Sequence, residues 1–308
     1  MSGAKPVYLS SKALHFGWDN SLPPALTVQP GAAVELDLID AGGGQIRSDS
    51  TAADVPGLDF AKINPVTGPI RIDGALPGDT LTVEILGLEG CGWGWTAIIP
   101  GFGLLAEEFS QPFLHISTYD GQWVNYTPEI RLPYRPFPGT IGVSPVEAGL
   151  QSVVFPRPGG GNMDIRHLTP GSKLYLPVQV EGALFSAGDG HAAQGDGEVC
   201  GTAVETTMKM TVRFGLEKGA PIAYPRFETT APASGPVQSF VTNGVAPDLM
   251  VAAKDAIRFM IDYLVREYRL TPELAYTVCS VAADLRISQI VDAPNWIVSA
   301  HLDKSIFG

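Results

Sequence analysis

Glycine and proline interrupt this chain so often that neither long helices nor long strands can dominate its fold. Its 308 residues include 35 glycines and 26 prolines, about a fifth of the chain, whereas about 12% is usual. Two turn signals, PVTG at 65–68 and LPGD at 76–79, are each followed by alternating apolar residues, which is typical of strands joined by tight turns. The pattern predicts many short antiparallel strands.

Two segments show the alternation of a half-buried strand. From Val204 to Phe214 the even positions are mostly apolar, while the odd positions, Glu205 among them, are polar; such a strand has one face in the core and one outside. In VELDLID, residues 34–40, the apolar positions share one face with Asp40. The following AGGG turn either rotates Asp40 outward or leaves it aimed into a site, and the pattern leaves both open.

Helices are expected only near the end of the chain. Residues 248–269 carry a polar stripe in steps of three or four, and residues 272–285 follow Thr271 as an N-cap, with Pro272 in the first turn. The segment after them, RISQIVDAPNWIVSAHL, predicts a final strand pair. The predicted fold class is α+β and β-rich, with antiparallel strands in sandwich-like or barrel-like sheets. We expect one compact unit over 1–308, with a soft division near residue 150.

Charge and cysteine content limit the partners. With 32 acidic and 20 basic residues the formal net charge is −12, which argues against nucleic acid or an anionic membrane surface as a partner. The most apolar segment, 247–268, is interrupted by Lys254, Asp255, Arg258 and Asp262, so no membrane-spanning helix is expected. Three cysteines and an N-terminus without an apolar leader favour a reducing, cytoplasmic location.

The densest group of reactive side chains lies at residues 186–201, SAGDGHAAQGDGEVCG. Glycines separate Asp189, His191, Gln194, Asp196 and Glu198, and in an extended chain the first two would point the same way. Histidine with carboxylates suits Zn²⁺, and several carboxylates suit Ca²⁺ or Mg²⁺. A metal with an open position activates water, and a nearby Glu can carry the proton to the leaving group. An acidic surface turn is the alternative, but apolar flanks favour a buried site.

A second oddity is GGGNMD at 159–164. Its glycines could form a nest of backbone N–H groups, with Asn162 and Asp164 reaching substrate or metal; equally, it could be a turn that caps the next strand. Neither a P-loop nor a dinucleotide fingerprint is present, which argues against nucleotide cofactors. No G-x-S-x-G elbow occurs. Cys200 and Cys279 are interpreted as core residues, while Cys91, in a Trp-rich loop, could be reactive.

Four strings together resemble the acetamidase/formamidase family: NPVTGPIRIDGALPGD, GGGNMD, EGALFSAGDGHAAQGDGE and CSVAADLRISQIVDAPN. They occur in the family's order, and the resemblance extends from about residue 13 to 303. It implies a metal-associated amidohydrolase of mixed, β-rich fold that releases ammonia from short aliphatic amides such as formamide and acetamide, and that forms a homo-oligomer.

The resemblance also implies roles for individual residues. The metal would be zinc first, with calcium or magnesium as alternatives, and the substrate a small neutral amide. Trp93 and Trp95 would narrow the pocket. The implied site residues are Asp40, Asp189 and His191 as metal ligands; Glu198 and Asp196 as proton carriers; and Gln45, Asn162, Asp164 and Gln194 around the substrate.

Two other functions stay open. One is a cysteine-dependent amide hydrolase of the nitrilase type that uses Cys91 or Cys200. The other is a non-catalytic member of the fold that binds a small amide or a metal. Intact Asp189, His191, Asp196 and Glu198 argue against this second alternative, because a retired site need not keep all four.

Overall fold

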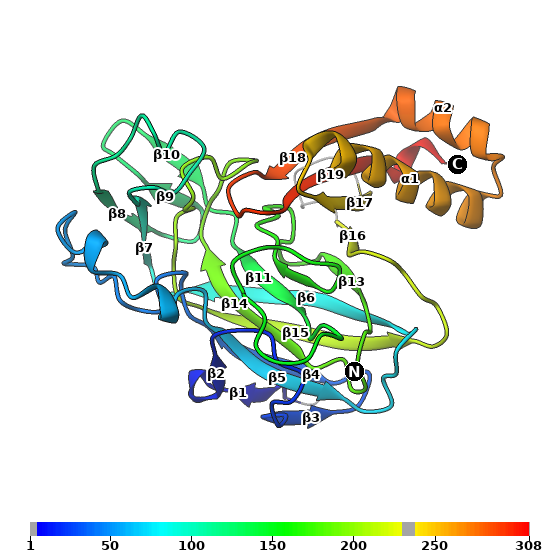
Figure 1. Ribbon diagram of the computed structural model, residues 1–308, viewed down its shortest axis with the longest axis horizontal. Coiled ribbons are helices and arrows are strands. Elements are labelled where there is room, and N and C mark those ends of the chain that lie inside the picture. The colour runs from blue at the N-terminus through cyan, green and yellow to red at the C-terminus, as the bar shows by residue number, and fades with distance from the viewer. Residues whose placement is uncertain (1–4, 230–237, 308) are drawn as a thin grey trace.

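The computed structural model describes residues 5–229 and 238–307 and arranges their strands in three open sheets (Figure 1). The largest sheet has nine strands in the order β1-β4-β15-β6-β13-β16-β17-β19-β18. All but one of its neighbouring pairs are antiparallel, the exception being β1 with β4. The bounds are β1 Val7–Leu9, β4 Ala33–Leu38, β6 Thr80–Gly90, β13 Lys173–Pro177, β15 Met208–Glu217, β16 Arg226–Glu228, β17 Ser239–Ala246, β18 Ala283–Gln289 and β19 Trp296–Asp303.

The second sheet packs against the first and carries Asp189 and His191 of the site described below. Its strands run in the order β12-β11-β14-β5-β2, and β3 pairs with β5. Apolar side chains of both sheets form one continuous core, in which the rings of Phe185 and Phe214 lie 5.0 Å apart. The bounds are β2 Leu14–His15, β3 Leu26–Val28, β5 Val66–Ile72, β11 Phe137–Val143, β12 Gly160–Asn162 and β14 Phe185–His191.

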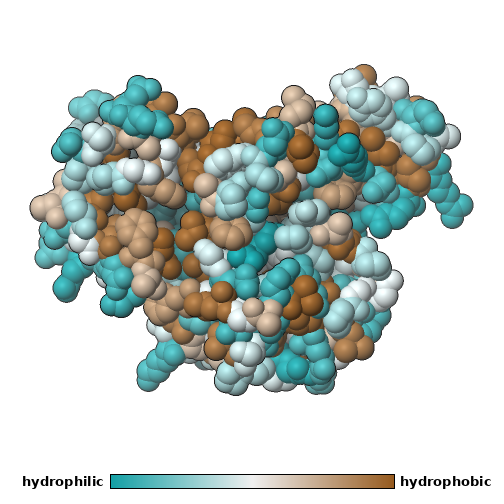
Figure 2. Space-filling view, in the orientation of Figure 1, coloured by the Kyte–Doolittle hydropathy of each residue, from teal (hydrophilic) through white to brown (hydrophobic). Residues whose placement is uncertain are grey.

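The third sheet forms the lobe at the left of Figure 1. It is an antiparallel meander in the order β10-β9-β8-β7, with β7 Trp93–Ile98, β8 Phe113–Tyr119, β9 Trp123–Asn125 and β10 Arg131–Pro133. Figure 2 shows hydrophobic residues gathered along the rim between this lobe and the helices on the right. Four single-turn 3₁₀ helices complete the described chain: Ser11–Ala13, Val55–Gly57, Phe60–Lys62 and Lys304–Ile306.

The predicted β-rich α+β class is confirmed. Two facing sheets share a core, as in a sandwich, and the sheets of the described residues remain open rather than closing into a barrel. Along β15 the side chains of Met208, Met210, Val212 and Phe214 are buried, as the alternation predicts. Strands from both sides of residue 150 are interleaved in the two larger sheets. The soft division at that point stays a prediction.

Two helices occur where the sequence predicts them, but the second is shorter than expected. α1 is Leu249–Tyr268, and α2, capped by the Thr271 side chain, is Pro272–Ala282. Residues 283–285, predicted to be helical, begin β18 instead. The reason is tertiary, because Ala283–Gln289 pairs with β19 and hydrogen-bonds its backbone there. The predicted final strand pair is therefore confirmed, and in the described residues no helix is long and apolar enough to cross a membrane.

Candidate active site

Five acidic side chains from distant parts of the chain converge on one small cavity. All five are buried, and the cavity has a volume of about 110 Å³. Among the described residues that line it there is no Lys or Arg, so its lining carries a concentrated negative charge. The five are Asp164, Asp189, Glu198, Glu205 and Asp292.

His191, at the end of β14, is the cationic partner within this group. Its Nε2 lies 3.0 Å from Oδ1 of Asp189 and 3.2 Å from Oε2 of Glu205. The expectation that Asp189 and His191 point the same way is therefore confirmed. Nδ1 of His191 lies 3.0 Å from Oε1 of Gln194, and the amide nitrogen of Gln194 donates to the carbonyl oxygen of Asp164 at 2.7 Å. Since Gln194 presents its oxygen to Nδ1, that nitrogen carries a hydrogen and Nε2 is left facing the carboxylates.

Gly139 in β11 makes this convergence possible. A Cβ atom at this position would lie 2.5 Å from Oδ2 of Asp189, 2.6 Å from Oδ1 of Asp164 and 2.7 Å from Cε1 of His191. Real Cβ atoms do not approach other heavy atoms so closely. Because Gly139 has no side chain, the space beside its Cα atom stays open, and the two carboxylates and the imidazole meet there.

The backbone around the cavity is strained. Seven non-glycine residues in the described chain have positive φ, and four of them line this cavity: Asn64, Asp164, Asp189 and Glu198, with φ between 44° and 59°. Such conformations are unfavourable for most side chains and concentrate at functional sites, where the surrounding structure enforces them. Their clustering here identifies the cavity as a site in which the required side-chain directions are reached at the expense of unfavourable backbone conformations.

A polar network supports the floor of the cavity. The side-chain oxygen of Asn162 accepts from Thr140 Oγ1 at 2.5 Å and from Asn64 Nδ2 at 3.0 Å. The amide nitrogen of Asn162 donates to Oδ2 of Asp292 at 2.8 Å. Asn162 lines the cavity, as expected for a substrate-contacting residue, but these bonds occupy its amide, so its visible role is to hold Asp292.

Burial and mutual repulsion perturb the acids. Burial raises the pKa values of Asp164 and Glu198 well above the usual range, and neighbouring carboxylates add to the effect. The pKa is raised by burial to about 7 for Glu205 and to about 6 for Asp292. In Asp189 burial acts in the same direction, but the adjacent His191 outweighs it and lowers the pKa. Acids that repel one another in this way hold protons unless a cation compensates their negative charge.

Burial would lower the pKa of His191, yet Glu205 and Asp189 outweigh burial and raise it well above its usual value. One imidazolium neutralises only one of the carboxylates. The remaining acids therefore need either protons or a bound cation.

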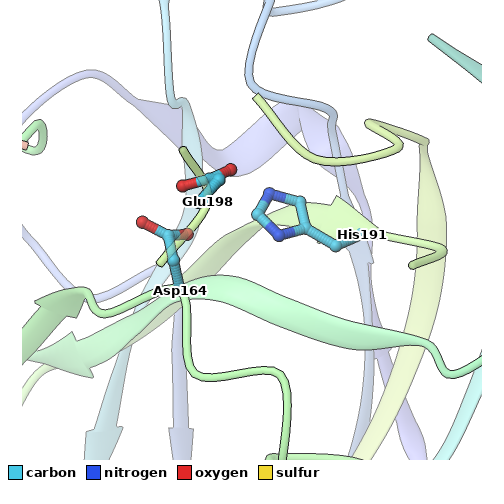
Figure 3. A group of neighbouring side chains, drawn as sticks. All are labelled: Asp164, His191 and Glu198. Carbon is cyan, nitrogen blue, oxygen red and sulfur yellow. The ribbon is translucent and has the colours of Figure 1, made fainter. Parts of the chain in front are cut away.

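The donor set fits a divalent cation. Ligand atoms of Asp189, His191 and Glu205 lie within 4.8 Å of one another, and those of Asp164, His191 and Glu198 do as well. Figure 3 shows the second group, with both carboxylates turned toward each other and toward the imidazole edge. Neither carboxylate oxygen of Asp164 accepts a hydrogen bond from the described residues. Buried, unpartnered oxygens beside an imidazole nitrogen are the ligands that Zn²⁺ takes in catalytic sites.

The other wall of the cavity is apolar. It is formed by Leu58, Phe60, Ile63, Trp95, Ile99 and Phe102. Trp95 lines the cavity, as expected, whereas Trp93 does not. The volume is well below the roughly 300–1,000 Å³ of pockets that bury drug-sized ligands. The cavity therefore suits a molecule with a polar head of a few atoms and a short apolar tail.

Apart from His191, which contacts two of the lining acids, four predicted site residues lie outside the lining of this cavity: Asp40, Gln45, Gln194 and Asp196. Asp40 is buried behind its wall, where its carboxylate accepts from the Gly42 amide at 3.0 Å and from Trp95 Nε1 at 3.3 Å. The side-chain oxygen of Gln45 accepts from the Asp59 amide at 2.8 Å, which fastens a surface loop. Neither Asp40 nor Gln45 is among the groups that converge on His191.

Asp196 forms an ion pair with Arg286 at 3.3 Å and lines a neighbouring cavity. Gln194 also lines that neighbouring cavity, and it reaches the acidic one only through His191 and the Asp164 backbone. Asp196 thus lies outside the acidic cavity that Glu198 lines, although the two are only two residues apart.

Sequence reasoning missed Glu205, Asp292 and Asn64. Glu205 was expected on the polar face of a strand, and this was wrong: β15 begins only at Met208. Instead, Glu205 forms isolated bridges with Trp95 and His191, which turn its side chain inward. Asp292 lies within the string QIVDAPN, and the resemblance of this string to the family was the signal that could have found it. No such signal marked Glu205.

None of the three cysteines lines the acidic cavity. Cys91 is exposed, Cys279 is buried, and Cys200 is half-buried in the lining of the neighbouring cavity. The thiol-based alternative therefore finds no support in the geometry of this site.

Comparison with known proteins supplies the family. The model of the Acetamidase/Formamidase family matches residues 2–154 and 146–308. The formamidase of Methylophilus methylotrophus is 27% identical over 365 residues, covering 96% of this chain and 89% of that protein. The acetamidase of Mycolicibacterium smegmatis is 30% identical over 274 residues, covering 68% and 67%. A Schizosaccharomyces pombe relative is 31% identical over 264 residues, and the alignment spans 67% of this chain and 64% of that relative, just under two thirds of its length.

Solved structures agree with this assignment. The acetamidase of Bacillus halodurans superimposes with a TM-score of 0.90 at 32% identity over 98% of both chains. A γ-lactamase from Delftia acidovorans has a TM-score of 0.70 at 26% identity, covering 96% of this chain and 89% of that one. With the family model spanning the described fold from end to end, the chain belongs to the acetamidase/formamidase family of amide hydrolases.

Proposed function

We propose that this chain hydrolyses short aliphatic amides, with formamide and acetamide as the first candidates, to a carboxylate and ammonia in the acidic cavity. The observation that carries the proposal is the convergence of five buried carboxylates on one small cavity with an apolar wall, with His191 in contact with two of them. The polar end fits an amide group, and the apolar wall fits a short alkyl chain. The substrate is neutral, so the surrounding acids do not repel it.

Asp189, His191 and Glu205 would hold a divalent metal ion, with zinc as the first candidate and calcium or magnesium as alternatives. When bound, such an ion polarises the amide carbonyl and makes water acidic enough to attack near neutral pH. Gln194 keeps Nε2 of His191 directed at this group by occupying Nδ1. Glu205 thereby takes the ligand position that the sequence had suggested for Asp40.

Glu198 would move the proton. Its carboxylate lines the cavity, and burial raises its pKa well above the usual value, which favours the protonated form. As a carboxylate, Glu198 can accept a proton from the attacking water, and the carboxylic acid formed in this way can deliver that proton to the departing nitrogen, a step worth roughly 10²–10⁴-fold in rate. Asp164 lies opposite and would orient the amide or complete the ligand set.

The proposal is tested by metal analysis of the purified protein together with an ammonia assay. The panel is formamide, acetamide, propionamide, larger linear amides and a γ-lactam, whose ring opening is followed separately because it releases no ammonia. We expect turnover of the short linear amides, loss of activity with a chelator and recovery with one added metal. Full activity in metal-free protein would refute the metal assignment, and no turnover of any amide would refute the substrate assignment.

Two variants separate the roles of neighbouring acids. Glu198→Gln is expected to keep the fold and the metal while losing most ammonia release. Asp196→Asn is the matched control, because its carboxylate faces Arg286 outside the cavity, and it is expected to stay close to wild type. Wild-type turnover in Glu198→Gln, or equal losses in both variants, would contradict the role of Glu198.

A cytoplasmic location and a homo-oligomeric state belong to the same proposal. Both derive from the sequence and from the family resemblance. Light scattering on the purified protein and fractionation of the cells that express it test them directly.

A further inference from the structure

A second cavity of about 460 Å³ lies on the other side of the loop that carries Glu198. Glu198 and Thr202 line both cavities, so this one loop separates them. The opposite wall of the second cavity comes from the β7–β10 lobe and its connection to β11. Unlike the first cavity, it is lined by two arginines, Arg135 and Arg166.

The two guanidinium groups are available to a ligand. Among the described residues no carboxylate lies within ion-pair distance of Arg135 or Arg166. Of the two acids in this lining, Asp196 is paired with Arg286 at 3.3 Å, and Glu198 is shared with the acidic cavity. This leaves an excess of positive charge beside the active site of a chain whose net charge is −12.

Neighbouring His167 shows that these charges lie close together. Burial lowers its pKa to about 4, and the positive charges of Arg166, Arg286 and Arg135 act in the same direction, opposed by Asp196. The imidazole is therefore neutral at physiological pH. The arginines supply the positive charge of this region.

The chemistry of the reaction identifies an anion that forms next to this charge. Hydrolysis converts a neutral amide into a carboxylate, and it does so beside five buried acids that repel the new charge. An arginine fork binds carboxylates through two parallel charge-assisted hydrogen bonds. Leu132, Val199 and Val204 in the lining of the same cavity offer contacts for a short alkyl chain.

We propose that the cavity of Arg135 and Arg166 is a carboxylate site that binds the short-chain acid released by amide hydrolysis. The acid bound there lies against Gln194 and Glu198, two residues tied to the active site. Its occupancy slows turnover without excluding the amide from the acidic cavity. The inference rests on amide hydrolysis by this chain and is independent of the metal.

The test is product inhibition in the native protein. Initial rates are measured against acetamide, or the best amide of the panel, at several concentrations of sodium acetate, with sodium chloride at matched ionic strength. We expect acetate to lower kcat with little change in KM. In the Arg135→Gln/Arg166→Gln double variant, kcat without acetate should be close to wild type, while the inhibition constant for acetate should rise roughly tenfold or more, as expected for the loss of charge-assisted bonds.

Arg131→Gln is the matched control, since this arginine is on the same lobe, rests on the Trp123 ring and is not part of the cavity lining. Acetate binding is also measured by calorimetry, which needs no turnover and so separates failure of this proposal from failure of the proposed function. Competitive inhibition that is unchanged in the double variant would overturn the proposal, as would an equal loss of acetate binding in Arg131→Gln. Absence of acetate binding to the wild-type protein would overturn it as well.

Discussion

Replacing Gly139 by alanine adds one methyl group at the point where the site converges. The new Cβ would lie 2.5 Å from Asp189 Oδ2, 2.6 Å from Asp164 Oδ1 and 2.7 Å from His191 Cε1, whereas ordinary contacts begin at 3.4 Å. The carboxylates must therefore retreat by about 0.9 Å and 0.8 Å, and the imidazole by about 0.7 Å. Since φ at Gly139 is not positive, the backbone itself accepts alanine, and the perturbation is confined to the three side chains.

A displacement of this size is expected to disable chemistry more than folding. Misplacing reacting groups by about 1 Å costs on the order of 100-fold in rate, whereas overpacking by one methyl group costs about 1–3 kcal/mol of stability. We therefore expect Gly139→Ala to lose about 100-fold in kcat/KM for ammonia release and to retain metal poorly.

The matched control is Gly87→Ala, where a Cβ meets nothing within 4 Å and φ is not positive. Activity, metal content and urea unfolding are measured for both variants and the wild type. If Gly139→Ala kept wild-type kcat/KM and metal content while remaining folded, the three side chains would not act as one site.

Three further predictions follow from the contacts of the cavity. Gln194→Ala removes the acceptor at His191 Nδ1 and should weaken metal binding roughly 10–100-fold, measured in metal buffers, whereas unchanged affinity would contradict the orienting role. In metal-free protein, burial raises the pKa of Glu205 from 4.5 to about 7. Between these two pH values the folded state retains a proton that the unfolded chain has released. The resulting contribution to the free energy of unfolding, about 3 kcal/mol for one group, is fully present below about pH 4.5 and is lost as pH rises to 7. Asp292, with its pKa raised to about 6, acts in the same direction. Urea unfolding between pH 5 and 8 should show this decline, with a shallower slope in Glu205→Gln; a flat profile would refute it. Cys200→Ser should leave kcat for ammonia release within about twofold, because the thiol lies outside the acidic cavity, and complete inactivation would revive the thiol mechanism.

The parts of the fold that the sequence predicts are those set by local pattern. Turn signals and alternation identify the strands, and the buried residues of β15 follow from period two alone. The end of α2 does not follow from the local pattern, because residues 283–285 are compatible with a helix and only their pairing with β19 makes them a strand. Sheet order, such as β15 lying between β4 and β6, depends on contacts between distant segments that one sequence does not reveal.

The candidate site divides in the same way. Asp189, His191 and Glu198 are visible because they share one glycine-spaced string, and their convergence on the cavity could be anticipated from it. Glu205 and Asp292 enter through long-range folding: Asp292 lies in a string that resembles the family, whereas nothing local distinguishes Glu205 from a surface acid. Conversely, Asp196 looks equivalent to Glu198 in the string, but its partner Arg286 lies 90 positions away and draws it out of the site.

Strain and charge repulsion coincide in the same few residues. Asp164, Asp189 and Glu198 have positive φ and are also mutually repelling buried acids, so each is unfavourable to the fold for two independent reasons. A chain selected only for stability would replace them, because neutral residues in relaxed conformations would remove both penalties. The cation proposed above would explain their joint presence, because it offsets the repulsion only when every carboxylate already points at it. The strained backbone and the acid excess are thus two parts of one arrangement, and the loop that holds Glu198 separates that negative centre from a positive cavity suited to the product acid.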